Sequence, residues 1–330
     1  MKTGKLPEHT LKRSVLAPIR YRREDIVSPG IGRDGAVVGD IVTAMASTAF
    51  CYTGNEIYAL NNALNNVIAA GGKPYGVELA VLLPEHSEEA DLRRIMDSLA
   101  KECEEKQIAI LGGHTELIPS VHFPTVVVTG FGKRLWSMDC SKVKSGMDII
   151  MTKWVGMYGG ALLAQLKKDE LITRYPVSYI DKAAQYMEYT SLMPELSVLE
   201  AAVAMQPDYI LHDVSNGGLF GALWQMLSNC NCGGTFRLSD IYMKQEIIEV
   251  CEYFNLNPYM MNGQGSLLVI TDKGNALVKQ FHEAGIEANI IGKTTKEMDR
   301  KVIIGEEERY LVPPKGDALN VVFYGQKMQI

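Results

Sequence analysis

Four segments of the chain contain both glycines, which allow unusual backbone conformations, and polar side chains. Glycine lets a backbone approach a ligand closely, and the free N–H groups at the start of a helix bind anions. Carboxylate and amide oxygens beside such glycines are the ligands that Mg²⁺ takes, usually together with phosphate oxygens. The segments are residues 30–38 (GIGRDGAVV), 65–74 (NNVIAAGGKP), 110–116 (ILGGHTE) and 212–219 (HDVSNGGL). Together they indicate a phosphate and magnesium site, although each one alone is more typical of an ordinary turn.

Three single residues are candidates for chemistry. Asp213 follows the apolar stretch YIL and His212, and burying a carboxylate there is costly without a partner or a metal, which favours a function. His114 lies between Gly113 and Thr115, where the sequence allows either a ligand-facing or a structural histidine. Lys153 follows the apolar stretch IIMT and is predicted to face either phosphate or solvent.

Other kinds of site find less support in the sequence. A Walker A loop, a GxSxG nucleophile elbow and an HExxH zinc motif do not occur. The six cysteines are scattered, and the close pair Cys230 and Cys232 has no second pair at zinc-finger spacing. We therefore expect small buried or surface thiols, without a disulfide framework.

The composition is that of a soluble globular protein. The chain has 330 residues, of which 47% are hydrophobic and 22% charged, with a formal net charge of −6. This balance argues against global disorder, and a mildly acidic chain has no bulk attraction to nucleic acid or to anionic lipid. No signal peptide and no long apolar run is evident, so we expect a cytoplasmic protein that binds neither membrane nor nucleic acid.

The elements that would position these residues form two series of strands and helices. After an extended arm with one helix at residues 8–16, the first series has strands at 35–51 (with a turn at Gly39 and Asp40), 75–83, 108–111 and 125–131, and helices at 56–70 and 87–105. The second series has strands at 148–152, 209–211, 266–271, 288–292 and 302–304, and helices at 159–167, 181–190, 195–205, 217–228, 247–254 and 275–284. The pattern predicts two α/β or α+β domains, residues 1–138 (with the arm) and 139–330.

Seven segments, in order, resemble the aminoimidazole ribonucleotide synthetase superfamily. This superfamily includes selenophosphate synthetase, thiamine-monophosphate kinase and a hydrogenase-maturation protein that dehydrates a thiocarboxamide to a nitrile, and the resemblance is nearest to that last branch. The segments are GIGRDGAVV, NNVIAAGGKPYGVELAVLLPE, ILGGHTEL, MTKWVGMYGGALLA, LSVLEAA, HDVSNGGLFGAL and NGQGSLLVI. Each motif alone is unspecific, whereas seven motifs in the same order are specific for this superfamily.

The resemblance implies a fold and a site. The expected fold has an N-terminal α/β domain, whose sheet pairs with a second copy in a homodimer, and a C-terminal α+β domain, with ATP and Mg²⁺ in a cleft. By the resemblance, the metal ligands would be Asp34, Asn66 and Asp213, the ATP-binding residues Gly112, Gly113, Thr115, Asn65, Asn216 and Gly217, and the catalytic residues Asp213, His114 and Lys153.

The sequence departs from the family pattern at places that concern the chemistry. Ser47 and Asn66 stand where the family usually has carboxylates, so we expect weakened metal affinity unless Glu116 or Asp40 compensates. The maturation branch has a carrier cysteine at the end of its tail, whereas this chain ends in YGQKMQI. The arm has no cysteine at the place of the reactive residue of selenophosphate synthetases.

Three functions remain open on the sequence. The leading hypothesis is an ATP-dependent enzyme that activates an amide or carboxylate-type oxygen by phosphoryl transfer, on a small molecule or a protein-borne substrate. The second is a nucleotide-binding or assembly protein with a degenerate metal site. The third is a kinase for a small metabolite, which ranks last because that branch prefers acidic residues at positions 114 and 216.

Overall fold

The computed structural model describes residues 4–21, 23, 26–27, 30–203, 209–313 and 315–325. The chain forms two compact units. The smaller unit comprises Arg23–Ser28 and Asp34–Ser137, and the larger unit comprises Met1–Arg22, Pro29–Arg33 and Met138–Ile330. The predicted division at residue 138 therefore lies beside the division between the units, but the arm groups with the larger unit and not with the N-terminal domain in which we had placed it.

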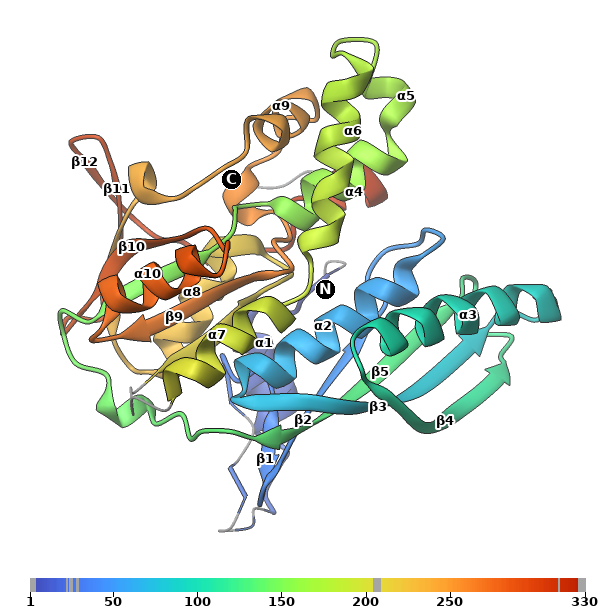
Figure 1. Cartoon of the computed structure of the whole chain (residues 1–330), viewed down its shortest axis with the longest axis horizontal. Coiled ribbons are helices and arrows are strands. Elements are labelled where there is room, and N and C mark those ends of the chain that lie inside the picture. Colours follow the sequence, from blue (N-terminus) through green and yellow to red (C-terminus); the bar gives the residue numbers. More distant parts are fainter. Residues whose placement is uncertain are drawn as a thin grey trace. The chain divides into compact units, whose positions relative to one another are not determined.

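The smaller unit is a five-stranded sheet with two helices on one face (Figure 1). The strands are β1 (Ala36–Val38), β2 (Ile41–Ser47), β3 (Gly72–Leu83), β4 (Ala109–Leu117) and β5 (Thr125–Arg134), in the order β1-β2-β5-β3-β4. Strands β3 and β4 pair in parallel, and the other neighbours pair in antiparallel fashion. Helices α2 (Asn55–Ala69) and α3 (Glu89–Glu105) bury apolar side chains against the sheet, among them Leu60, Leu64, Ile95 and Leu99.

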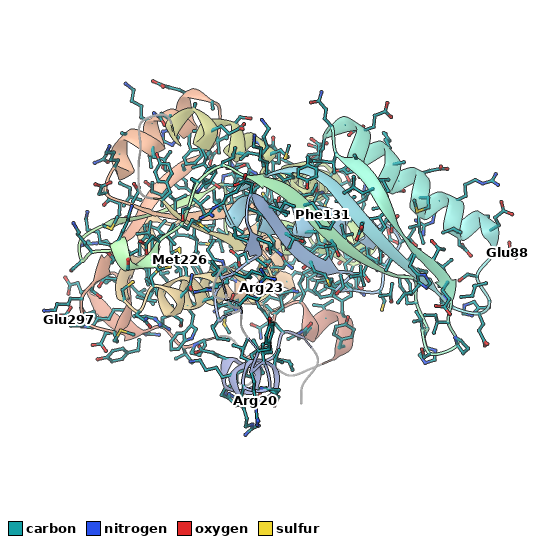
Figure 2. All side chains as sticks on the ribbon, turned by 90° about the horizontal axis from the view of Figure 1, so that it is seen from below. Arg20, Arg23, Glu88, Phe131, Met226 and Glu297 are labelled. Atoms are coloured by element: carbon teal, nitrogen blue, oxygen red, sulfur yellow. The ribbon has the colours of Figure 1, made fainter. Side chains whose placement is uncertain are left out.

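A capping box explains where α3 begins. Glu88 caps the helix in a reciprocal capping box with Asp91, which satisfies N–H groups of the first turn. Figure 2 shows α3 starting next to the labelled Glu88, with the side chains of its outer side pointing away from the sheet. The same view shows Phe131 on β5, a strand whose residues alternate between buried and partly buried positions.

The larger unit is built around a seven-stranded sheet with the order β12-β11-β8-β10-β6-β9-β7. Its strands are β6 (Asp148–Thr152), β7 (Ile210–Val214), β8 (Gly233–Arg237), β9 (Ser266–Thr271), β10 (Ala288–Thr295), β11 (Arg300–Ile304) and β12 (Glu307–Tyr310). Strands β8 and β11 pair in parallel, and the other neighbours are antiparallel.

Helices of the larger unit vary widely in length. The α-helices are α1 (Glu8–Leu11), α4 (Met157–Leu166), α5 (Lys168–Leu171), α6 (Val177–Gln185), α7 (Met193–Val203), α8 (Gly218–Asn229), α9 (Gln245–Tyr253), α10 (Gly274–Glu283) and α11 (Asn320–Tyr324). A π-helical turn, η1 (Lys12–Leu16), continues α1, and short 3₁₀ turns are η2 (Cys140–Lys142), η3 (Tyr186–Tyr189), η4 (Leu238–Asp240) and η5 (Pro258–Met260). Within the described part of the chain, none of the helices combines the length and the apolar character needed to cross a membrane.

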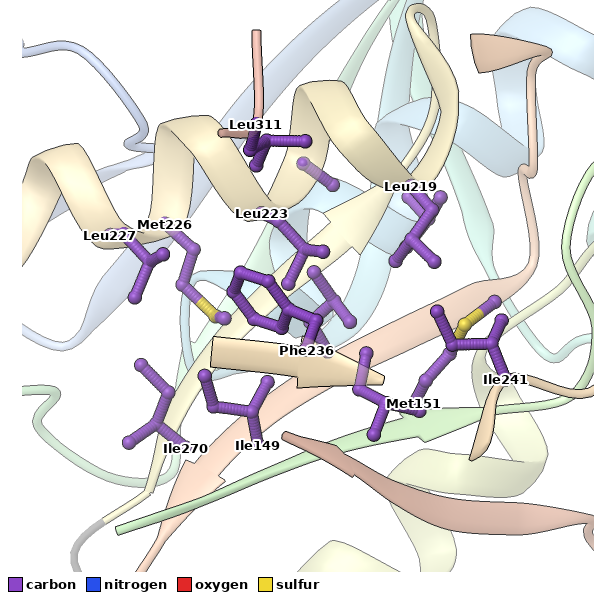
Figure 3. Packing of buried hydrophobic residues seen from close by; sticks show 14 of the residues in the cluster. Ile149, Met151, Leu219, Leu223, Met226, Leu227, Phe236, Ile241, Ile270 and Leu311 are labelled. Carbon is purple, nitrogen blue, oxygen red and sulfur yellow. The ribbon is translucent and has the colours of Figure 1, made fainter. Parts of the chain in front are cut away.

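The core of the larger unit joins α8 to the sheet. Figure 3 shows Phe236 of β8 between Leu223 and Met226 of α8 and the sheet residues Ile149 and Ile270. Phe236 is 1% exposed, and burying an aromatic side chain of this size contributes about 2–3 kcal/mol to stability. This core fixes the axis of α8, whose first turn carries one of the four glycine segments.

Several predicted boundaries differ from the structure. The strand predicted at residues 108–111 continues to Leu117, so GGHT lies inside β4. The strand predicted to begin at residue 75 begins at Gly72 and includes Pro74, which is tolerated because β4 starts to pair with β3 only at Gly76. The helix predicted at residues 195–205 is α7, and positions 204–208 lie outside the described residues.

Candidate functional site at the start of helix α8

The segment HDVSNGG joins strand β7 to helix α8. Gly217 and Gly218 have φ of 92° and 64°, in the region that favours glycine. A Cβ at Gly218 would lie 2.6 Å from the carbonyl oxygen of Met261, so a larger residue would have to displace that backbone. The two glycines therefore bring the start of α8 close to residues 259–261.

A carboxylate that the sequence analysis missed caps this helix. The backbone N–H of Gly217 donates to Asp317 Oδ2 (2.8 Å), and the N–H of Leu319 donates to Asp317 Oδ1 (3.0 Å). Asp317 is 3% exposed, and burial raises its pKa to about 6, although N–H donors from Gly217, Leu319 and Asn262 and the charge of Lys5 act in the opposite direction. An acidic group thus lies at the positive end of α8. No local pattern marks Asp317, because its partner is 100 residues away.

The segments HDVSNGGLFGAL and NGQGSLLVI meet beside Asp317 at the start of α8. Asn262 Nδ2 donates to Asn216 Oδ1 (3.0 Å), and the N–H of Gln264 donates to Asn262 Oδ1 (3.0 Å). Asn262 and Gln264 are buried, whereas Asn216 is partly exposed. Asn262 therefore fixes the orientation of the Asn216 side chain, one of the predicted ATP-binding groups.

A cavity of about 760 Å³ opens at this helix start, entirely within the larger unit. A volume of this size suits a small-molecule ligand or cofactor. It is lined by the arm from Lys5 to Lys12, by Ile31, by residues 216–217 with Gly221, Trp224 and Gln225 of α8, and by residues 312–313 and 315–316. The titratable side chains along its wall are the ammonium groups of Lys5, Lys12 and Lys315, the imidazole of His9 and the carboxylate of Glu8. The three lysines and His9 outnumber the single carboxylate of Glu8, which makes the cavity suitable for an anionic ligand.

The arm is held on α8 by two side-chain hydrogen bonds. Trp224 Nε1 donates to Glu8 Oε2 (2.9 Å), and Lys5 Nζ donates to Gln225 Oε1 (3.0 Å). The guanidinium of Arg300 lies 4.0 Å from the centroid of the Trp224 ring, an attractive cation–π distance. Together these contacts give the cavity a wall that comes from residues 5–12.

Asp213, which was predicted to be both a catalytic residue and a metal ligand, lies in β7. Strand β7 is buried along its whole length, and Asp213 and His212 are 4% and 2% exposed. Ile210 and Val214 belong to the core below α8, and a ring nitrogen of His212 lies within 4.8 Å of a carboxylate oxygen of Asp213. A carboxylate buried to this degree needs compensating charge or hydrogen bonds, which is compatible with a metal-binding function.

Lys153 is buried and is engaged within the larger unit. Its Nζ donates to the carbonyl oxygens of Tyr189 (3.0 Å), Ser191 (2.8 Å) and Gly265 (2.9 Å). It also pairs with the Glu195 carboxylate at 3.0 Å. Burial lowers the pKa of Lys153, and Glu195 opposes this shift. Its backbone φ of 56° is unusual for a non-glycine residue. Lys153 is 5% exposed, so the alternative that it faces solvent is wrong. To act on a phosphate, the other alternative, this ammonium would have to exchange one of these partners.

The predicted phosphate residues of the smaller unit lie on an edge strand. Gly112, Gly113, His114 and Thr115 are exposed residues of β4, and the prediction that the strand ends before them is wrong. His114 Nε2 lies 3.0 Å from Glu116 Oε2. A Cβ at Gly113 would lie 1.9 Å from the carbonyl oxygen of Leu79, so the pairing of β4 with β3 already requires this glycine.

The remaining predicted residues of the smaller unit occupy two places. Asn65 and Asn66 lie in the last turn of α2, where Asn65 is 1% exposed and the Asn66 carbonyl accepts the N–H of Ala70 (2.9 Å). Asp34 is partly buried in the segment that precedes β1. Oxygen atoms of these three side chains are chemically suited to Mg²⁺, and their grouping as metal and ATP ligands stays a prediction.

Comparison with protein families matches both parts of the chain. Residues 35–133 match the N-terminal domain of AIR synthase related proteins, and residues 144–305 match their C-terminal domain. This chain belongs to the AIR synthase related family. The two matched regions contain most of the residues proposed for the site, with Asp34 immediately before the first region.

Several curated relatives of this AIR synthase related protein are hydrogenase expression/formation proteins or HypE carbamoyl dehydratases, and another is a selenide, water dikinase. A putative hydrogenase expression/formation protein of Methanocaldococcus jannaschii is 26% identical over 271 residues, which are 79% of this chain and 76% of that protein. Carbamoyl dehydratase HypE of Rhodobacter capsulatus is 23% identical over 282 residues, 82% of this chain and 79% of the relative. The resemblance to the hydrogenase-maturation branch is thus confirmed.

Solved structures show the same fold. HypE in a complex with HypF has a TM-score of 0.72 at 19% identity and covers 92% of this chain and 99% of that one. HypE in complex with ATP has a TM-score of 0.69 at 17% identity, with 93% of this chain and 92% of that one covered. A thiamine monophosphate kinase from Aquifex aeolicus has a TM-score of 0.65 at 16% identity over 88% of this chain and 95% of that one. The predicted two-domain AIR synthase-like fold is therefore confirmed.

Proposed function

We propose that this AIR synthase related protein is an ATP-dependent enzyme that activates an amide or carboxylate-type oxygen by phosphoryl transfer. The observation that carries the proposal is the cavity at the start of α8, which joins the predicted ATP-binding residues Asn216 and Gly217 to cationic side chains of the arm. The names of the relatives support it, since they include carbamoyl dehydratases and a solved HypE with ATP. A nucleotide triphosphate and an oxyanion intermediate are both anions that such a cavity would attract.

The residues of the cavity would have two roles, charge neutralisation and the positioning of the ligand. Lys5, Lys12 and Lys315 would neutralise phosphate charge, and Asn216, held by Asn262, would donate a hydrogen bond from a fixed position. Catalysis of phosphoryl transfer depends mainly on such positioning and charge stabilisation. Gly217, whose N–H donates to Asp317, lies in the wall beside Asn216.

Mg²⁺ fits the proposed ligands, Asp34, Asn66 and Asp213. All three offer oxygen donors, and Asp213 is a carboxylate that is almost completely buried. When bound, the ion would neutralise charge on the transferred phosphoryl group. With an amide at position 66, the set has fewer negative charges than the family pattern, so we propose that the metal binds weakly.

We also propose a homodimer formed through the smaller unit, which would act in the cytoplasm. Helices cover one face of its sheet, and β4 forms an exposed edge whose apolar side chains include Ile110, Leu111 and Leu117. An unpaired edge of this kind favours pairing with another strand. A second copy of the chain is the proposed occupant of this edge.

Isothermal titration of ATP, with and without Mg²⁺, tests the proposed function. We expect binding that Mg²⁺ strengthens, and release of ADP once a carboxamide- or carboxylate-bearing substrate is added. Asp213→Asn should abolish turnover while ATP still binds, because the metal site would lose one of its two carboxylates. Absence of ATP binding under both conditions would exclude the enzyme.

A second candidate is a nucleotide-binding protein that has lost turnover. The neutral residues Ser47 and Asn66 favour it, since both replace carboxylates of the family pattern. In that case ATP binds without a requirement for Mg²⁺, and Asn66→Asp creates an ATPase that the parent protein lacks. An Asn66→Asp variant as inactive as its parent would argue against this alternative.

A further inference from the structure

Two cysteine side chains of the larger unit lie against each other. Cys140 begins the 3₁₀ turn η2, a few residues after the division between the units, and Cys230 directly follows the last residue of α8. Their Sγ atoms are 3.2 Å apart, although 90 residues separate them along the chain. From the sequence both are expected to be ordinary thiols, because their proximity leaves no local pattern.

The two thiols have different surroundings. Cys140 is partly exposed, whereas Cys230 is 8% exposed. Asn229 Nδ2 donates to Cys140 Sγ (3.3 Å), and Arg33 Nε donates to Asn229 Oδ1 (3.4 Å). A solvent-accessible sulfur with hydrogen-bond donors and a nearby guanidinium has the environment of a reactive cysteine.

The charges of this cluster favour the thiolate of Cys140. The S–H of Cys230 donates to Cys140 Sγ, and this hydrogen bond, with the charge of Arg33, lowers the pKa of Cys140 against the opposing effects of burial and of Asp139. The same hydrogen bond and burial raise the pKa of Cys230. Cys140 is thus the nucleophile of the pair and Cys230 the protonated partner.

We propose that Cys140 and Cys230 form a redox-reactive dithiol, which a small-molecule disulfide converts into an intramolecular disulfide. The Cys140 thiolate attacks one sulfur of the oxidant, so that a mixed disulfide forms and one oxidant thiolate leaves. Cys230 then gives its proton to solvent or to that thiolate, and its sulfur attacks Cys140 Sγ. The second oxidant thiolate leaves, and the two protein thiols are oxidised as the disulfide oxidant is reduced to two thiols.

The geometry allows this bond with a small adjustment. A disulfide has an S–S distance of about 2.05 Å, so the two sulfurs must approach by roughly 1 Å from their separation of 3.2 Å. Cys140 lies in a short exposed turn, where a change of side-chain torsion is inexpensive, while Cys230 is held by the core below α8.

Closure would restrain a specific part of the larger unit. The bond ties the segment after the division between the units to the C-terminal end of α8, and α8 begins at the cavity described above. A covalent loop of this length reduces the conformational freedom of the unfolded chain, so the oxidised protein should be more stable than the reduced one.

The test is disulfide mapping of the full-length protein with Cys51→Ser, which removes an exposed thiol that would react between molecules. The protein is incubated with oxidised glutathione, and the remaining thiols are then blocked with N-ethylmaleimide and the tryptic peptides analysed by mass spectrometry. We expect the loss of two thiols, a linked pair of peptides containing Cys140 and Cys230, and a Tm higher by about 5 °C or more.

Single variants in the same background test the order of the steps. Cys230→Ala should stop at one glutathione on Cys140, Cys140→Ser should keep all its thiols, and Cys251→Ala, a buried control, should oxidise as the parent does. A linkage between Cys140 and Cys232, or a parent protein whose Cys140 and Cys230 both remain alkylatable at saturating oxidised glutathione, would overturn the proposal. Both outcomes can be read from the parent protein alone, even where a variant fails to fold.

Discussion

At the scale of single residues, Asp317 has the clearest effect on the candidate site. It is a buried carboxylate whose two oxygens accept N–H groups from separate segments, at Gly217 and Leu319. These bonds fix the first turn of α8 to the segment after β12. The cavity therefore has its shape only when this long-range contact is formed.

Asp317 should make stability depend on pH. Its folded pKa, raised to about 6 from 3.8, means that the folded state binds the proton more tightly than the unfolded state does. Stability from this group is therefore greatest below about pH 4 and is lost as the pH rises through about 6. Relative to Asp317→Asn, the wild type should gain on the order of 2–3 kcal/mol in free energy of unfolding between pH 7 and pH 4. Urea unfolding of both proteins across this range measures the difference, and parallel pH profiles would contradict it.

Gly112 and Gly113 form a matched pair in β4. A Cβ at Gly113 would meet the carbonyl oxygen of Leu79 at 1.9 Å, whereas the same atom at Gly112 meets open space. We expect Gly113→Ala to lower the free energy of unfolding by more than about 2 kcal/mol and Gly112→Ala to change it by less than about 0.5 kcal/mol. Chemical denaturation of the two variants gives the comparison, and equal losses would show that the clash is relieved elsewhere.

At the scale of elements, the smaller unit presents β4 as an unpaired edge. Its nine residues are exposed in the single chain, and three of them are large and apolar. Long exposed edges of this kind are usually covered or paired in stable proteins. The proposed second copy supplies such a cover.

Leu111→Lys should convert the proposed dimer into a monomer. Leu111 is 51% exposed in the single chain, so the lysine leaves the folded monomer intact but places a charge in the interface. Light scattering after size exclusion measures the mass, and circular dichroism confirms the fold. Leu166→Lys, at an exposed position of the larger unit, is the control and should remain dimeric. A wild type that is monomeric at all accessible concentrations would rule out this edge pairing.

The elements were largely predictable from the sequence, whereas several contacts of the site were not. Amphipathic periodicity predicted α2, α3 and α8 because one face of each helix carries apolar residues at the helical spacing. The strand predicted to end at residue 111 continues to Leu117. Two consecutive glycines are typical of a turn, but here Gly113 lies within the strand and allows β4 to pair closely with β3. Asp317, the Glu8–Trp224 bond and the Cys140–Cys230 contact join distant segments, and no local pattern encodes such distances.

At the scale of the whole molecule, the candidate cavity depends on segments from both ends of the chain. The arm supplies Lys5, Lys12 and the carboxylate of Glu8, α8 and the two residues before it supply a second wall, and residues 312–313 and 315–316 supply a further wall with Lys315. This arrangement concentrates positive charge in a chain whose net charge is −6. Local charge, and not the overall balance, therefore determines what the cavity attracts.

Replacing both arm lysines tests that idea. Lys5→Gln with Lys12→Gln should weaken ATP binding by about tenfold and reduce its dependence on salt, since two charge-assisted contacts are lost. Lys101→Gln with Lys279→Gln, at exposed positions on α3 and α10, is a charge-matched control and should bind ATP as the parent does. Titration calorimetry at two salt concentrations measures both effects, and an unchanged affinity in the double variant would place ATP elsewhere.

The order in which the segments are made has a consequence for biosynthesis. The smaller unit is almost continuous in the chain, so its sheet can form as soon as residue 137 has left the ribosome. The arm is translated early, whereas its hydrogen-bond partners on α8 come 216 and 220 residues later in the chain. The arm therefore cannot dock before α8 has been made, and until then it is accessible to chaperones and proteases.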